Sequence, residues 1–217
     1  MRTDQVTAED VRTAVYLATD TLATAKERNW QLPAGELDWN CWETVEHIAD
    51  DLFAYAGQLG PRHPSVEGPV PFGWEYRRTG GPALTIWAAP ADGTTGLLQV
   101  LESAGALLAA MVEVTPPTVR AHHVYGAADP EGFAAMGVVE TLVHMRDVAA
   151  GLELAWEPPD ELCARVLARL FPDAPAGPDH WRTLLWATGR IALPGHERLT
   201  SWRWQGAPLK PVSPPTG

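Results

Sequence analysis

The sequence is poor in cysteine and has no long apolar run. Its 217 residues include two cysteines, Cys41 and Cys163, which lie far apart and form no Cys-x-x-Cys motif. Two thiols in a chain of this length do not resemble the disulfide framework of a small secreted domain. The polar N-terminus has no apolar signal core. The longest apolar run, Gly105–Val112, is too short to cross a bilayer. These absences predict a soluble, cytoplasmic protein with no membrane partner.

Positive charge is also scarce. Lysine and arginine number 16 against 27 acidic residues, so the formal net charge is −11, and Arg77-Arg78 is the only adjacent basic pair. An acidic surface repels phosphate backbones, so we expect no nucleic-acid partner. No P-loop, Gly-x-Gly-x-x-Gly motif, Gly-x-Ser-x-Gly motif or internal repeat is present. Rare lysine with abundant alanine, glycine, proline, arginine and tryptophan hints at a GC-rich bacterial genome.

The sequence does contain apolar residues at helical spacing. Four long helices are predicted, at about 7–28, 40–59, 94–114 and 130–152, and two shorter ones at about 160–170 and 180–191. Thr7, Asn40 and Asp129 are the expected N-cap residues of three of them. The fold class predicted is therefore all-α: a four-helix bundle at residues 1–157, with a C-terminal helical extension and tail at 158–217 packed on it.

The segments between and after the helices carry further predictions. Residues 60–92 are rich in proline and glycine and form a long connection, which favours a crossover topology, with a short extended piece at 83–89. Trp74, Tyr76 and Trp87 suggest that this connection packs over another part of the protein instead of moving freely. Residues 199–204 alternate aromatic and polar side chains, which predicts an extended strip on the bundle and leaves a homodimer open. The proline-rich last residues are expected to be loose.

Two polar residues in an otherwise apolar helix need an explanation. Glu140 and His144 are four residues apart, so a helix places them on one face. A bound metal is one explanation, and an internal hydrogen-bond network or a solvated face are the others. Helix 40–59 adds His47 beside its apolar face, which would complete a set of two histidines and one glutamate. Such a set serves catalytic zinc, and it also suits nickel, iron or manganese.

Three segments resemble the DinB-like superfamily, and in particular the branch that includes the N-terminal domain of mycothiol-dependent maleylpyruvate isomerase. One has Asp38-Trp39 and Trp42 ahead of Val45-Glu46-His47-Ile48-Ala49. The second reads Val139-Glu140-x-x-x-His144-x-x-Asp147-x-Ala149-x-Gly151, and is similar to a later helix of that branch. The third, residues 184–190, resembles a segment near the end of short actinobacterial members.

The resemblance implies a bundle that binds a divalent metal, usually zinc, through His47, Glu140 and His144. It also implies a low-molecular-weight thiol as co-substrate, mycothiol in actinobacteria, which is added to or transferred onto an electrophilic small molecule. The chain would then be a thiol S-transferase or a cis–trans isomerase. Residues 158–217 do not match the long C-terminal domain of the full isomerase, so maleylpyruvate itself is not implied. A non-catalytic metal- or ligand-binding bundle and a metal-dependent hydrolase remain alternatives.

Charged neighbours of the three proposed ligands each have two interpretations. Asp51 and Asp147 could orient His47 and His144, or they could be surface acids at helical spacing. Arg146 and Arg190 could hold carboxylates of substrate or thiol, or they could simply be solvated. Other side chains have similar alternatives. His122 and His123 could supply a fourth ligand or be ordinary loop histidines, Cys41 is expected in the core rather than as a nucleophile, and Trp74, Trp87 or Trp186 could form the wall of a pocket.

Overall fold

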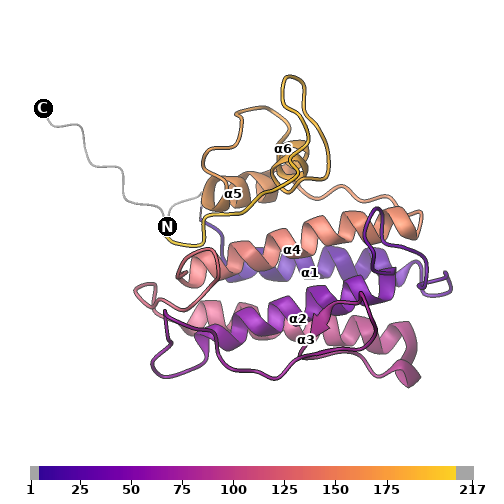
Figure 1. Ribbon diagram of the computed structural model, residues 1–217, viewed down its shortest axis with the longest axis horizontal. Helices are drawn as coiled ribbons and strands as arrows, with labels where there is room; N and C mark the ends of the chain where they lie inside the picture. The colour runs from indigo at the N-terminus through magenta and orange to yellow at the C-terminus, as the bar shows by residue number, and fades with distance from the viewer. Residues whose placement is uncertain (1–4, 209–217) are drawn as a thin grey trace, which may run out of the picture.

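The computed structural model describes residues 5–208 and is an all-α bundle, which confirms the predicted fold class. Four long helices form the bundle and two shorter ones cover one side of it (Figure 1). Their bounds are α1 Ala8–Ala23, α2 Cys41–Leu59, α3 Gly93–Val114, α4 Pro130–Gly151, α5 Asp160–Leu170 and α6 His180–Ala187. The prediction of a loose proline-rich end concerns residues outside the described range.

The four long helices run up, down, down and up. The start of α1 meets the end of α3, where Arg12 Nη2 lies 2.7 Å from Glu113 Oε2. The same end of α1 meets the start of α4 through a bond from Val6 N–H to Glu131. The start of α2 meets the end of α4, where Cys41 Sγ lies 3.7 Å from the carbonyl of Val148. Helices α2 and α3 are therefore parallel, and residues 60–92 form the predicted crossover between them.

Local capping explains where these helices begin and end. Thr7 and Asn40 each form a capping box, with Asp10 and Glu43 respectively, as their residue types predict. Two helices stop earlier than the sequence suggested. Helix α1 ends at Ala23 rather than near residue 28. At this end, the Thr24 hydroxyl donates a hydrogen bond to the carbonyl of Thr21. Helix α6 ends at Ala187 rather than 191, because Gly189 takes a positive φ of 71° and turns the chain.

Helix α4 is the centre of the molecule. It packs against α1, α2 and α3 on one side and against α5 on the other. Its side chains are consequently buried around most of its circumference, and one continuous apolar cluster joins the bundle to α5 and α6. A helix that is buried on all sides has no solvated face on which polar residues can be placed without cost. Ionisable residues on α4 therefore need partners inside the protein.

Helix α3 qualifies by its length and composition as a membrane-crossing helix. The segment Pro90–Val114 has 25 residues and a mean hydropathy of 1.6 over its most apolar window. Polar residues interrupt this segment, so no single uninterrupted apolar run in the sequence indicates it. The stripe that contains Leu97, Leu101 and Leu108 is buried against the bundle. Core packing thus accounts for the apolar character of that stripe.

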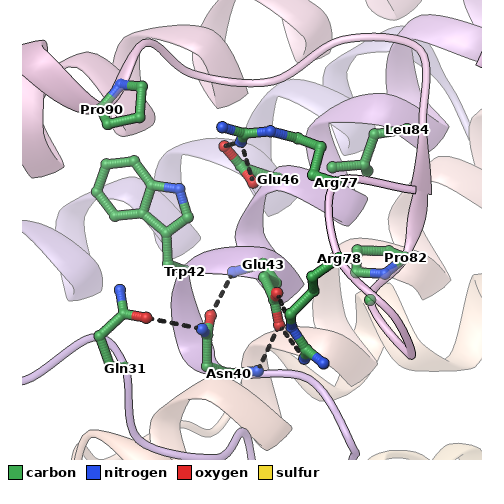
Figure 2. Close-up of a pocket in the computed structure, with 11 residues that line it drawn as sticks. Gln31, Asn40, Trp42, Glu43, Glu46, Arg77, Arg78, Pro82, Leu84 and Pro90 are labelled. Atoms are coloured by element: carbon green, nitrogen blue, oxygen red, sulfur yellow. Dashed lines mark hydrogen bonds and ion pairs between the residues drawn. The ribbon is translucent and has the colours of Figure 1, made fainter. Parts of the chain in front are cut away.

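The crossover follows the outer face of α2 and is fixed there by charge. Arg77 Nη1 lies 3.2 Å from Glu46 Oε1, and Arg78 Nη2 lies 2.6 Å from Glu43 Oε2 (Figure 2). Further along, the Asp50 carboxylate accepts the backbone N–H groups of Thr85 and Ile86 at 2.7 and 2.8 Å. Three acids on one face of α2 thus satisfy donors from the connection that returns along it.

The crossover also contains the short extended piece that the sequence predicted. Two-residue strands, β1 Glu75–Tyr76 and β2 Ala83–Leu84, pair antiparallel, and a single 3₁₀ turn, η1 Pro90–Asp92, leads into α3. Trp74 and Tyr76 are 63% and 62% exposed, so these two side chains do not provide the packing predicted for them. Ion pairs and hydrogen bonds attach this segment to α2, together with Phe72, whose ring centroid lies 5.3 Å from that of Phe53 on α2.

The close approach of α4 to the loop before α2 gives a stability prediction. A Cβ atom on Gly151 would lie 2.3 Å from the carbonyl oxygen of Pro33 and 2.5 Å from Cys41 Sγ. We expect Gly151→Ala to lower the free energy of unfolding by about 1–3 kcal/mol, because backbone atoms must move to admit the methyl group. Urea denaturation followed by tryptophan fluorescence measures this. Gly73→Ala, whose added methyl would meet no atom within 4 Å, is the control. An unchanged midpoint for Gly151→Ala would contradict the packing described.

Candidate metal centre

Helices α2 and α4 bring the three predicted ligands together. One ligand atom from each of His47, Glu140 and His144 lies within 4.8 Å of the other two. The closest pair is His144 Nε2 and Glu140 Oε2, at 3.1 Å. Zinc binds such nitrogen and oxygen ligands at about 2.0–2.2 Å, so neighbouring ligand atoms of a tetrahedral ion are roughly 3.4 Å apart. Small side-chain movements would therefore bring all three donors to a common ion, and this group could hold a metal.

The two nitrogens of His144 face different partners. Its Nε2 points to Glu140, and its Nδ1 faces Asp147 Oδ2 at 3.6 Å, just beyond hydrogen-bond distance. Among the residues that the structure describes, this Nδ1 is buried without a hydrogen-bond partner. Metal-ligating histidines commonly present one nitrogen to the ion and the other to a carboxylate. The arrangement around His144 has that pattern, with Nε2 as the ligand atom and Asp147 positioned to orient the ring.

Asp147 is held by both arginines that the sequence singled out. Arg146 Nη1 reaches Asp147 Oδ1, and Arg190 Nη2 reaches Asp147 Oδ2, each at 3.1 Å. The side chain of Asp147 is only 3% exposed, so these bonds compensate a buried carboxylate. Asp147 is thus not a surface acid, and the two arginines are paired with it rather than left in solvent. Because Arg190 follows α6, this contact ties the C-terminal extension to the site.

His47 has a different environment. Its Nε2 lies 3.4 Å from Asp51 Oδ2, and its ring packs edge-on against Trp39, with centroids 4.7 Å apart. Its ring centroid is 5.0 Å from that of His144. The side chains of His47 and Asp51 are 19% and 20% exposed, whereas those of Glu140 and His144 are 13% and 10% exposed. The cluster is therefore largely buried and more open on the α2 side.

Burial and neighbouring charges shift the pKa values of the two histidines in opposite directions. Burial, reinforced by the nearby His144, lowers the pKa of His47 to about 4. Burial also acts to lower the pKa of His144, but the carboxylates of Asp147 and Glu140 outweigh it, and the net pKa is raised. Without a metal, His144 with Glu140 is therefore the charged pair of the cluster, and His47 is neutral.

Burial and neighbouring charges also move the pKa values of Glu140 and Asp51 in opposite directions. Burial acts to raise the pKa of Glu140, but its contact with His144 prevails and the net pKa is lowered. Burial and the charge of Glu140 raise the pKa of Asp51 well above its usual value. Glu140 is thus anionic, whereas the raised pKa of Asp51 favours a protonated neighbour of His47 at lower pH. A divalent cation placed between them would favour the ionised form of both acids.

The remaining candidates lie outside the three-residue cluster. The His123 ring is 6.0 Å from that of Tyr55 and the His122 Nδ1 is 3.4 Å from the carbonyl of Val66, so neither joins the group that could hold a metal. Cys41 is fully buried, and burial raises the pKa of its thiol to about 11, as expected for a core cysteine. Of the three candidate wall tryptophans, Trp74 and Trp87 are exposed, and Trp186 borders an open cavity between the ends of α5 and α6 and the tail segment 199–205.

Sequence reasoning did not assign a role to Trp39 or to the buried Glu46. The signal for Trp39 was its place one residue before the Asn40 cap, which directs it across the first turn of α2 to His47. The signal for Glu46 was the Arg77-Arg78 pair, since an isolated basic pair in an acidic protein predicts acidic partners. The contact of Trp39 is local to the start of α2, whereas that of Glu46 joins two segments 31 residues apart that the sequence alone does not bring together.

Comparison with known proteins adds no identification. No protein-family model, curated protein or solved structure significantly matches this chain.

The lowered pKa of His47 gives a pH prediction for the metal-free protein. A histidine pKa near 6.5 when unfolded and about 4 when folded means that the unfolded chain binds more protons between these values. The stabilising contribution of neutral His47 is therefore full above about pH 6.5 and is lost as the pH falls towards 4. Over this pH range the free energy of unfolding of the wild type should fall by on the order of 1–3 kcal/mol because of His47. We expect His47→Gln not to show this part of the fall.

Urea denaturation of metal-free protein at pH 4.5 to 7.5 checks this expectation. His144 has the opposite sign, because its raised pKa stabilises the fold below about pH 6.5 and that contribution is lost as the pH rises. His63→Gln, a change at an exposed crossover residue, is the control and should keep the wild-type slope. If His47→Gln and wild type have the same slope, the assignment of a neutral buried His47 is wrong.

Proposed function

We propose that the protein is a metal-dependent enzyme whose ion is held by His47, Glu140 and His144. The observation that carries this proposal is the convergence of these three side chains from two facing helices, with their ligand atoms within 4.8 Å. Two imidazoles and one carboxylate leave a position for a further ligand, as in catalytic rather than structural sites. Zinc suits this set best, and nickel, iron and manganese share its ligand preferences.

The surrounding residues support this role. Asp147 faces the His144 nitrogen that is not directed at Glu140, and Arg190 and Arg146 hold that carboxylate in place. Trp39 packs against the ring of His47 and restricts its rotation. A bound zinc ion would supply a Lewis acid that lowers the pKa of a thiol or of water. The chain itself positions the three donors, and its partly exposed α2 side leaves an approach for small molecules.

We further propose a thiol S-transferase or isomerase of the DinB-like type that acts on an electrophilic small molecule. The support is the resemblance around residues 38–49 and 139–151 together with the intact set of three ligands. A low-molecular-weight thiol, mycothiol in an actinobacterial cytoplasm, is the co-substrate. In a transferase, its sulfur would bond to the electrophilic carbon as the bond from that carbon to the leaving group breaks, the leaving group taking the electron pair and the thiol proton passing to solvent. In an isomerase, the sulfur would add to one carbon of an activated double bond, and the π electrons would move onto the activating group. After rotation about the resulting single bond, the carbon–sulfur bond would break and the double bond would re-form.

The metal assignment predicts a clear binding result. Wild-type protein expressed with zinc should retain about one zinc ion per chain after dialysis. We expect His144→Ala and His47→Ala each to weaken zinc binding by more than about 100-fold, because even groups that only orient a ligand change metal affinity by roughly 10- to 100-fold. Metal analysis by inductively coupled plasma mass spectrometry and competition with a chromogenic chelator measure this.

His180→Ala is the matched control for the histidine variants. His180 pairs with Asp160 on the surface at the start of α6, away from α2 and α4, so its loss should leave zinc binding unchanged. Zinc-free wild-type protein, or variants that bind zinc as the wild type does, would eliminate the transferase, the isomerase and the hydrolase together. A non-catalytic bundle would then remain.

The chemical proposal has a separate test. Zinc-loaded protein incubated with mycothiol and a panel of haloaromatic, epoxide and enone electrophiles should give thiol adducts detectable by mass spectrometry, at rates that fall at least tenfold in His47→Ala. Formation of hydrolysis products without thiol would identify a metal-dependent hydrolase instead. Full activity of His47→Ala would contradict the three-ligand assignment.

A further inference from the structure

Arg190 connects the C-terminal extension to the proposed metal centre through Asp147. The described part of the extension comprises α5, α6 and the tail, and it lies on the side of α4 away from α2 and α3 (Figure 1). Arg190 follows the end of α6, and its Nη2 lies 3.1 Å from Asp147 Oδ2. The same oxygen faces His144 Nδ1 at 3.6 Å. Asp147 Oδ2 therefore stands between the extension and a proposed metal ligand.

Arg146 binds the same carboxylate in a different way. Its Nη1 reaches Asp147 Oδ1, whereas the contact with His144 Nδ1 involves Oδ2. The side chain of Arg146 is 31% exposed and that of Arg190 is 12% exposed. Solvent weakens an exposed ion pair more than a buried one, so the contact with Arg190 constrains the carboxylate more strongly. Loss of Arg190 would leave Oδ2 free to turn away from the imidazole.

Arg190 is itself held by the end of α6 and by the tail. Its Nη1 donates to the carbonyl of Thr188 at 2.8 Å, and its guanidinium carbon lies 5.9 Å from the centre of the Trp202 ring. Gly189 turns the chain here, and a Cβ atom on it would lie 2.9 Å from both the Leu199 carbonyl oxygen and Trp202 Cδ1. The tail thus packs directly against the turn that carries Arg190. The position of this guanidinium therefore depends on how the tail lies on α6.

Other ion pairs attach the extension to the bundle without involving the three proposed ligands or Asp147. Arg165 Nη2 on α5 lies 2.5 Å from Asp10 Oδ1 on α1. Arg169 Nη2, also on α5, lies 2.9 Å from Asp129 Oδ1 at the start of α4. These two contacts should hold the extension on the bundle in variants of Arg190. An effect of Arg190 on the metal centre can therefore be separated from detachment of the whole extension.

We propose that Arg190 is a positioning residue through which the docked extension sets the metal affinity of the cluster on α2 and α4. Arg190 fixes Asp147 Oδ2, which accepts a hydrogen bond from His144 Nδ1 when Nε2 of that ring is bound to the ion. Groups that orient a ligating histidine in this way change metal affinity strongly when they are lost. The inference rests on the proposed metal site, because it concerns one of its ligands. Metal binding and docking of the extension are then linked, and each strengthens the other.

Competition with a chromogenic chelator measures the effect of Arg190 on zinc affinity. We expect Arg190→Gln to weaken zinc binding by about 10- to 100-fold, as is typical when an outer partner of a metal ligand is lost. Arg190→Lys keeps the charge but cannot bind Asp147 and Thr188 in the same fixed geometry, so it should recover only part of the loss. Arg146→Gln should have a smaller effect than Arg190→Gln. Arg165→Gln, which removes an ion pair of the extension away from the metal centre, is the control and should bind zinc as the wild type does.

A double-mutant cycle shows whether Arg190 acts through Asp147. In the Asp147→Asn background, Arg190→Gln should weaken zinc binding no further, because the carboxylate that Arg190 holds is already gone. A general loss of stability would instead give independent, additive effects. In cobalt-substituted protein, the visible absorption spectrum of Arg190→Gln should resemble that of Asp147→Asn, whereas Arg165→Gln should keep the wild-type spectrum.

The tail provides a second variant, which keeps the test decisive if Arg190→Gln does not fold. Trp202→Leu removes the ring beside the guanidinium and leaves Arg190 in place, so we expect zinc binding to weaken by about 2- to 10-fold. Hydrogen exchange measures the reciprocal effect. Zinc should slow exchange of the amides of α6 more than those of α1 in the wild type, and this difference should be lost in Asp147→Asn.

The positioning role is overturned if folded Arg190→Gln, or Trp202→Leu where Arg190→Gln does not fold, binds zinc as tightly as Arg165→Gln. It is equally overturned if the effect of Arg190→Gln persists in Asp147→Asn. A wild-type protein that binds no zinc overturns both this inference and the proposed function. Zinc binding that is equally tight in wild type and Arg190→Gln overturns this inference alone and leaves the metal assignment intact.

Discussion

The structure depends on how ionisable side chains are compensated inside the seam between α2 and α4. Placing two imidazoles and a carboxylate within 4.8 Å of one another removes them from water, and that desolvation must be offset. The chain offsets part of it with the pair formed by His144 and Glu140, and part with the bonds that Asp147 receives from Arg146 and Arg190. His47 is left neutral and only partly exposed. A cation bound between α2 and α4 would offset the rest of this desolvation cost.

The sequence predicted those features that depend on local spacing. Apolar periodicity and the caps at Thr7, Asn40 and Asp129 were enough to locate six helices, and the i, i+4 relation placed Glu140 and His144 on one face. The length of the 60–92 connection was enough to favour the crossover. Helix ends were less certain, because the hydroxyl of Thr24 and the backbone angle of Gly189 act against apolar patterns that continue past them.

Contacts between distant segments could not be predicted from the sequence. The pairing of Arg190 with Asp147 depends on how the extension lies on α4, and no pattern within either segment encodes it. The burial of Trp204 and the satisfied N–H of Trp186 depend in the same way on where the tail runs. Alternation of aromatic and polar residues in the tail predicted that it would lie on the bundle, but not which rings would meet or which donor would lack a partner. The sequence gives the chemical type of each side chain, whereas tertiary packing determines which residues surround it.

The two faces of helix α2 carry different sets of ionisable residues. Its outer acids, Glu43, Glu46 and Asp50, are occupied by donors from the crossover, while its inner face carries His47 and Asp51. The second half of the crossover, from Arg77 to Ile86, is consequently constrained in sequence and in length by the acids it must meet. The first half is held by different contacts: the Ser65 carbonyl accepts the His122 N–H at 2.8 Å, and Gln58 Oε1 accepts the Val70 N–H at 2.9 Å. Evolutionary variation in charge should therefore be unequal along this connection, being selected against where residues meet the acids of α2 and accepted among the exposed residues 61–63.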